Sequence, residues 1–299
     1  MSQYIPIVVL TICVAHGIAP LLIKKTSDMK SSRKRLVVLF GFCAIVAITI
    51  AYIAGELRHI THLALIVVVI GILNSLAVLC QWQAVHISLS KTSLFTFWDD
   101  LIGMGLAALF LHETQVFNTV TALGMSISIF AVILFAVISY RRRRLENSLL
   151  KNKLSFYFYV LGYSVIWGLS IFVYRHVGLE GLSTSLFLAS WYVGSALGAS
   201  MILLLGKTVY TTEEKLPLRH ILWMLGLGIA IMSANALTYV SYLRVPLNIA
   251  QPIFLVGEMV LPAFIGLYIF HERNKLTLLE KLLFALGLIG SVIIACNFQ

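Results

Sequence analysis

The stretch AVHISLSKTSLFTFWDDLIGMGLAALFLHE (Ala84–Glu113) returns in altered form in the second half of the chain, as LRVPLNIAQPIFLVGEMVLPAFIGLYIFHE (Leu243–Glu272). Both segments have the same length and end in His-Glu, and Asp99 aligns with Glu258 without a gap. Two unrelated apolar helices would rarely share an acid and a terminal His-Glu at one register. The match therefore indicates an internal repeat.

A second match lies near the start of each copy. VAHGIAPLLIK (Val14–Lys24) aligns with VIWGLSIFVYR (Val165–Arg175), and in both a glycine is followed seven residues later by a base. We therefore predict two five-helix repeats, at residues 1–145 and 155–299. Because five is odd, the second copy would enter the membrane from the opposite side, which is the inverted-repeat plan of many secondary transporters.

The composition predicts an all-α polytopic membrane protein. Hydrophobic residues make up 60% of the 299 residues and charged residues 11%, whereas soluble domains carry about 25% charged residues. The mean hydropathy is +0.96. A bilayer core needs about 20 apolar residues per helix, and ten stretches meet this need. The predicted spans are Ile5–Ile23, Leu36–Ile53, Leu63–Ala84, Leu89–Leu111, Val120–Tyr140, Phe156–Tyr174, Leu186–Leu205, Ile221–Leu243, Ile249–Phe270 and Leu276–Cys296.

The basic residues predict an orientation. The formal net charge is +10, and 19 of the 22 Lys and Arg residues fall in loops on one side of the predicted spans. The three on the other side are Arg58, Arg175 and Arg244. Positive loops stay in the cytoplasm, so both termini are predicted outside it, in a multi-pass protein of the cell inner membrane. The lipid bilayer, rather than nucleic acid, explains the positive charge.

The spaced motifs resemble those of a known family. They are Trp167-Gly168, Leu243-Arg244, Glu258 and Glu272. Glu258 lies midway between Arg244 and Glu272, and the set is similar to the Trp-Gly and LRY…LEP…LGE pattern of EamA-type ten-helix members of the drug/metabolite transporter superfamily. The resemblance covers nearly the whole chain. It implies export of small metabolites such as amino acids, amines or drug-like solutes.

Two acids at equivalent positions dominate the candidate site. An ionised side chain at the centre of a membrane helix costs at least about 2.5–3.5 kcal/mol. Asp99 and Glu258 can therefore form a proton-coupling or cation-binding pair, or serve as hydrogen-bond anchors between helices. A third interpretation starts the fourth span late and leaves Asp99 and Asp100 near an aqueous vestibule. Asp100 has no acidic counterpart, because Met259 aligns with it.

Polar and aromatic residues of the same spans complete the predicted substrate and proton-coupling site. The candidates are Asp99, Glu258, Gln83, Tyr242, Tyr239, Asn235, Asn74, Trp98, Trp167 and His16. Asn235, Tyr239 and Tyr242 share one helix face. The same residues can instead bind helices together, and the aromatic ones can form an interfacial belt.

Several chemistries have no motif in the chain. There is no Walker sequence, GxSxG, GxGD, HExxH or CxxC. We therefore expect no cofactor, no metal and no enzyme activity. The favoured function is a secondary transporter that exports small zwitterions or cations by alternating access, coupled to protons through Asp99 and Glu258. Its partners would be a small-molecule substrate, protons and lipid, and it would be a monomer or homodimer. The alternatives are a non-transporting membrane sensor or assembly protein, and an intramembrane enzyme.

Overall fold

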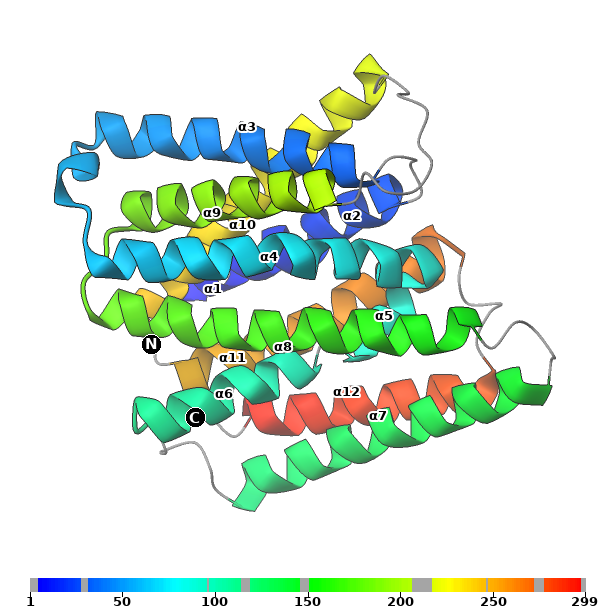
Figure 1. Cartoon of the computed structure of the whole chain (residues 1–299). Coiled ribbons are helices and arrows are strands. Elements are labelled where there is room, and N and C mark those ends of the chain that lie inside the picture. Colours follow the sequence, from blue (N-terminus) through cyan, green and yellow to red (C-terminus); the bar gives the residue numbers. More distant parts are fainter. Residues whose placement is uncertain are drawn as a thin grey trace.

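The chain folds into a bundle of helices. The computed structural model describes residues 5–27, 32–95, 97–113, 119–145, 151–205, 217–245, 247–271 and 277–296, with no strand among them. In chain order the helices are α1 (Ile5–Thr11), η1 (Ile12–Ile18), α2 (Ala19–Ser27), α3 (Ser32–Ile53), η2 (Glu56–His59), α4 (His62–Ile87), α5 (Leu89–Phe95), α6 (Phe97–Phe110), α7 (Thr119–Leu145), α8 (Lys151–Leu179), α9 (Thr184–Leu205), α10 (Leu218–Arg244), α11 (Leu247–Phe264), η4 (Ile265–Ile269) and α12 (Leu278–Cys296). Most of them run along a common direction (Figure 1).

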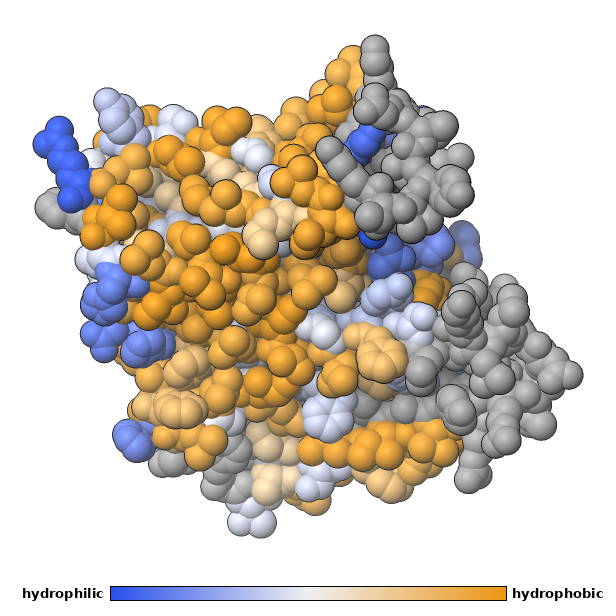
Figure 2. Space-filling model, viewed as in Figure 1, coloured by the Kyte–Doolittle hydropathy of each residue, from blue (hydrophilic) through white to orange (hydrophobic). Residues whose placement is uncertain are grey.

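The bundle is an all-α membrane protein. Among the described residues, seven helices are long and apolar enough to cross a bilayer, and two shorter apolar helices span Ala122–Phe135 and Ile253–Ile269. Apolar side chains cover the middle of the face drawn in Figure 2, while hydrophilic ones gather at its left edge. Large apolar side chains such as Leu65, Val69 and Leu204 are exposed on the surface of the bundle. A lipid surrounding accounts for this exposure, and the predicted fold class is confirmed at this level.

The bundle has two distinct ends. Helix α1 begins and α12 ends at one of them, which we call the termini end (Figure 1). At the opposite end, α2 finishes and α3 begins, near Lys24, Lys25, Arg33 and Lys34. We call this the basic end. Long helices such as α4 and α8 connect the two ends. A site midway between the two ends therefore lies at the level of the apolar surface in Figure 2.

Two of the membrane segments change their helical form along their length. In the first, the wide π-helical turn η1 joins α1 to α2 just before Pro20, which has no N–H to continue an α-helical ladder. In the second, α11 passes into the π-helical η4. π-Helical turns often mark functional sites, and both segments border the cavities described below.

Small residues allow α4 and α9 to cross at close range. A Cβ on Gly194 or Gly198 of α9 would collide with backbone atoms of α4, and a Cβ on Gly71 of α4 would collide with α9. The side chain of Asn74 donates to the Ser195 hydroxyl at the same crossing, at 3.0 Å. Lipid tails are as apolar as the side chains, so the hydrophobic effect does not drive helices together in a membrane. Close backbone approach and interhelical hydrogen bonds stabilise helix association instead.

The crossing predicts opposite effects for one substitution at two sites. Gly198→Ala would press a methyl group on Ser75 and the backbone of Ile72, so we expect a loss of about 1–3 kcal/mol of stability from overpacking. Gly41→Ala, on α3 with nothing within 4 Å of its new Cβ, should gain about 0.5–1 kcal/mol because alanine is the better helix former. Thermal unfolding of both variants in detergent measures the difference, and equal transitions would contradict the packing argument.

Candidate functional site

A cavity of about 120 Å³ lies between helices from both parts of the chain. Its lining includes residues of η1, α4, α6, α8, α10 and α11. Seven of the ten residues selected from the sequence line it: His16, Asn74, Asp99, Trp167, Asn235, Tyr242 and Glu258. The helices thus bring together in space two acids that come from opposite halves of the chain.

The other three candidates do not line this cavity. Tyr239 is fully buried in helix packing: its hydroxyl donates to the Leu182 carbonyl at 2.7 Å, and its ring stacks on Phe187 with centroids 3.9 Å apart. Gln83 is half-buried away from the cavity, and Trp98 is exposed. Tyr239 shares a helix face with Asn235, and both contact α9, but Phe187 covers the Tyr239 ring.

Asp99 lies on α6, in a turn that also carries Asp100. Gly168 brings α8 against this turn, since a Cβ there would lie 2.8 Å from the Asp99 carbonyl oxygen. The indole of Trp167, the preceding residue, lines the same cavity. The Trp167-Gly168 pair therefore has a local physical role: the glycine admits the helix and the tryptophan faces the site.

Glu258 enters from the opposite side on α11. Its neighbour Gly257 lies against η1, where a Cβ would come within 2.8 Å of Ile12 and 3.5 Å of His16. The Tyr163 hydroxyl lies next to the Glu258 carboxylate and accepts a hydrogen bond from Gln81 Nε2 at 3.5 Å. Glu258 thus has a hydroxyl beside it and the cavity in front of it.

Asp100 is completely buried and does not line the cavity. Gln251 of α11 donates to one of its carboxylate oxygens, and the Tyr242 hydroxyl donates to the amide oxygen of Gln251. Asp99 is only 2% exposed. Both aspartates are therefore enclosed by protein, which disfavours the aqueous-vestibule interpretation of this stretch.

Tyr163 and Gln251 belong to the site although neither was selected from the sequence. Tyr163 lies four residues before Trp167, and Gln251 lies seven residues before Glu258. Both spacings put the pair on one helix face. Helical spacing from residues already selected was the signal that would have found them.

The cavity has an excess of negative groups. Asp99, Asp100 and Glu258 lie within electrostatic range of one another, and none of the described residues that line the cavity is Lys or Arg. Carboxylates enclosed together cannot all remain charged without a compensating cation. The site therefore calls for protons, a cationic ligand, or one in exchange for the other.

Three buried polar atoms of lining residues have no hydrogen-bond partner in the part of the chain that the structure describes: Asp99 Oδ1, Asn74 Oδ1 and Trp167 Nε1. A buried polar atom left without a partner costs about 1–3 kcal/mol. Two of these atoms are acceptors and one is a donor, so a ligand that satisfies them needs hydrogen-bond donors and at least one acceptor. Among the described residues, no group of three or more His, Cys, Asp or Glu side chains could hold a metal ion.

The fold is similar to one that has been solved experimentally. The crystal structure of another protein superposes with a TM-score of 0.65 at 14% sequence identity, over 100% of this chain and 99% of that one. At this identity the likeness concerns the fold alone. No family model matches the chain, and no curated protein matches it.

The buried amide at position 251 generates a stability prediction. Gln251→Leu would leave the Asp100 carboxylate without the donor it has and the Tyr242 hydroxyl without its acceptor. We expect a loss of about 1–3 kcal/mol for each buried group left unsatisfied, measured by thermal unfolding in detergent. Gln83→Leu is the matched control, and it should change stability by less than about 0.5 kcal/mol because the side chain is half-buried outside the cavity. Equal effects would contradict the hydrogen-bond chain.

Proposed function

We propose that the protein is a secondary transporter that carries small cationic or zwitterionic molecules across a membrane by alternating access. The observation that carries the proposal is the shared cavity onto which Asp99 and Glu258 open from distant parts of the chain. In a membrane protein, ionisable groups that face an internal cavity mark a substrate or ion pathway by default. The unpartnered acceptors of Asp99 and Asn74 suit an ammonium group, and the indole N–H of Trp167 suits an acceptor such as a carboxylate.

We propose further that ten spans form two inverted repeats, residues 1–145 and 155–299, as in EamA-type transporters. The helix contacts come in equivalent pairs, which supports this reading. α4 packs on α8, and its proposed counterpart α10 packs on the segment of α1, η1 and α2. The proposed counterparts α3 and α9 pack on each other, as do α7 and α12. A pseudo-two-fold axis between inverted repeats would generate contacts of this kind.

The π-helical segments fit the same mechanism. His16 lies in the π-helical η1, and Glu258 lies on α11 before the π-helical η4. Transporters place substrate and ion sites on discontinuous helices near the middle of the bilayer, and the two halves rock about them. In this proposal, protons on Asp99 and Glu258 exchange with a cationic substrate, because both compete for the same negative groups.

The proposed topology has the basic end in the cytoplasm of a cell whose inner membrane holds the protein, and both termini outside. The 19-to-3 division of Lys and Arg supports it. The position of both chain ends at one end of the bundle supports an even number of spans (Figure 1). The direction of transport, export of amino acids, amines or drug-like solutes, rests on the family resemblance.

Flux in proteoliposomes tests the function directly. The purified protein should release or accumulate members of a panel of amino acids, amines and organic cations when a proton gradient is imposed, and the rate should change when the gradient is reversed. Empty liposomes are the control. No flux for any member of the panel under gradients of both signs would reject transport and leave a sensor or assembly role.

Neutralising the two acids tests their role. Asp99→Asn and Glu258→Gln keep the shape of each side chain but cannot bind and release a proton, so each should lower proton-driven flux by at least about tenfold while the protein still inserts and folds. Trp98→Phe is the matched control, because this side chain precedes Asp99 but does not line the cavity. Normal flux of both acid variants from acidic to alkaline pH would rule out proton coupling at this site.

A further inference from the structure

An ion pair lies at the termini end of the bundle. Arg175 of α8 donates its Nε hydrogen to Glu113 Oε1, with the two atoms 2.8 Å apart. The other carboxylate oxygen of Glu113 accepts the backbone N–H of Leu247, the first residue of α11, at 3.1 Å. Arg175 also donates to the Tyr242 carbonyl of α10. One charged pair thus joins the end of α6 to three helices of the C-terminal repeat.

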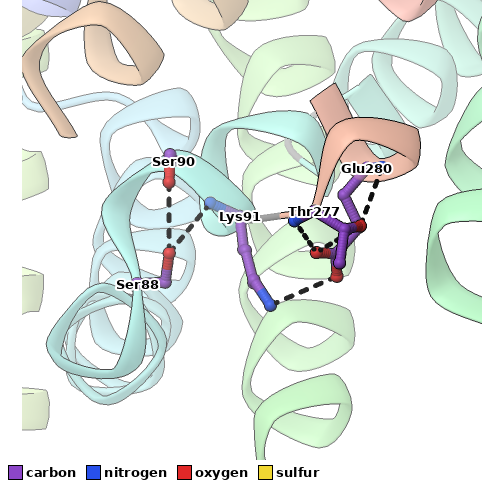
Figure 3. Close-up of polar contacts among 5 residues, drawn as sticks. All are labelled: Ser88, Ser90, Lys91, Thr277 and Glu280. Carbon is purple, nitrogen blue, oxygen red and sulfur yellow. Dashed lines mark hydrogen bonds and ion pairs between the residues drawn. The ribbon is translucent and has the colours of Figure 1, made fainter. Parts of the chain in front are cut away.

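A second ion pair lies at the basic end and also joins the two proposed repeats. Here the base belongs to the N-terminal repeat and the acid to the C-terminal repeat. Lys91 of α5 faces Glu280 of α12, with Nζ and Oε1 3.6 Å apart, as Figure 3 shows. Both side chains are almost fully buried. The second oxygen of Glu280 accepts the backbone N–H of Thr277 at 2.8 Å, and Thr277 Oγ1 accepts the N–H of Glu280 at 3.2 Å. This reciprocal capping box fixes the carboxylate at the start of α12.

The aligned bases of the second sequence match each bind carbonyls near the end of a helix. Lys24 and Arg175 are aligned. Lys24 donates to the carbonyls of Val85 and His86 at the end of α4, at 2.8 and 3.3 Å, and Arg175 donates to the Tyr242 carbonyl near the end of α10. Basic groups bind the unsatisfied carbonyls at a helix C-terminus favourably. Since α4 and α10 are counterparts in the proposed repeat, each repeat has one such clasp, at opposite ends of the bundle.

Each ion pair lies on a helix that also lines a cavity. At the termini end, Tyr242 lines the larger cavity and its carbonyl accepts a hydrogen bond from Arg175. Toward the basic end, a smaller cavity of about 70 Å³ extends from Glu258 to Leu89, Thr92 and Ser93 of α5, the helix that carries Lys91. An opening at either end must therefore displace a helix that one of the pairs holds.

We propose that Arg175–Glu113 and Lys91–Glu280 are two latches, one for each opening of the cavity, and that transport releases them in turn. The inference rests on the alternating-access function proposed above. Each pair joins the two repeats, so a rocking motion of one repeat against the other separates one pair while the other stays closed. Removing one charge from a buried pair strongly favours the state in which that pair is already apart.

Side-specific labelling of a cavity residue tests the latches without any substrate. Cys13, Cys43, Cys80 and Cys296 are first replaced by alanine, and Thr238, which lines the cavity, becomes cysteine. A membrane-impermeant maleimide is then added to right-side-out or inverted vesicles, and the ratio of the two labelling rates is measured. Glu113→Gln and Glu280→Gln are a matched pair, because each loses one charge yet keeps an oxygen that can accept the backbone N–H.

The expected results are opposite in sign. Glu113→Gln should raise labelling from the side of the termini end by about tenfold relative to the parent ratio, and Glu280→Gln should raise labelling from the other side by a similar factor, equivalent to about 1.4 kcal/mol. Glu180→Gln, an exposed acid after α8, should leave the ratio unchanged. Shifts in the same direction, or none, would overturn the proposal.

A second set of variants distinguishes the loss of an ion pair from a loss of folding. Arg175→Met and Lys91→Met remove the other member of each pair and should shift the ratio as the matching glutamine variant does. Arg175→Lys, which keeps the charge and the donor, should leave the ratio near the parent value. Because labelling needs no transported molecule, opposite shifts without any flux would retain the latches and reject transport. Flux with unchanged labelling would retain the transport function and reject the latches.

Discussion

In the hydrocarbon core of a membrane, a backbone or charged group has no water with which to form hydrogen bonds. The protein must therefore provide a partner for each such group, and this constraint determines where its charged residues lie. Every interruption of a helix frees backbone groups that another part of the protein must bind. The carbonyls at the end of α4 are bound by Lys24, and the Tyr242 carbonyl near the end of α10 is bound by Arg175. These two buried bases are therefore placed where the backbone receives them.

The same constraint separates the two signs of charge. The acids Asp99 and Glu258 open on the cavity, which is lined by no Lys or Arg of the described residues. The buried bases Lys24, Lys91 and Arg175 lie toward the ends and bind carbonyls or carboxylates. A Lys or Arg inside the cavity would neutralise the acids permanently. Keeping these bases at the ends leaves the cavity open to a mobile proton or cation.

Glycine decides how closely these groups can meet. Gly168 brings α8 onto the first turn of α6, next to Asp99, and Gly257 brings α11 onto the π-helical turn that carries His16. A larger residue at either position would push the two helices apart and widen the cavity. The small residues thus set the geometry of the site, while the α4–α9 crossing, with Gly194 and Gly198, holds the bundle together around it.

The sequence by itself determined the all-α membrane class, because apolar stretches of bilayer length have no other stable form, and its internal match was the reason to select Asp99 and Glu258 together. Seven of the ten residues selected from the sequence line the cavity, since helical spacing assigns residues to one face of a helix. Only the tertiary structure decided which faces meet. Tyr239 shares a face with Asn235 yet packs on Phe187, whereas Gln251 and Tyr163 entered the site unselected. Periodicity gives the direction of a side chain from its own helix, but the neighbour it meets depends on how the helices pack.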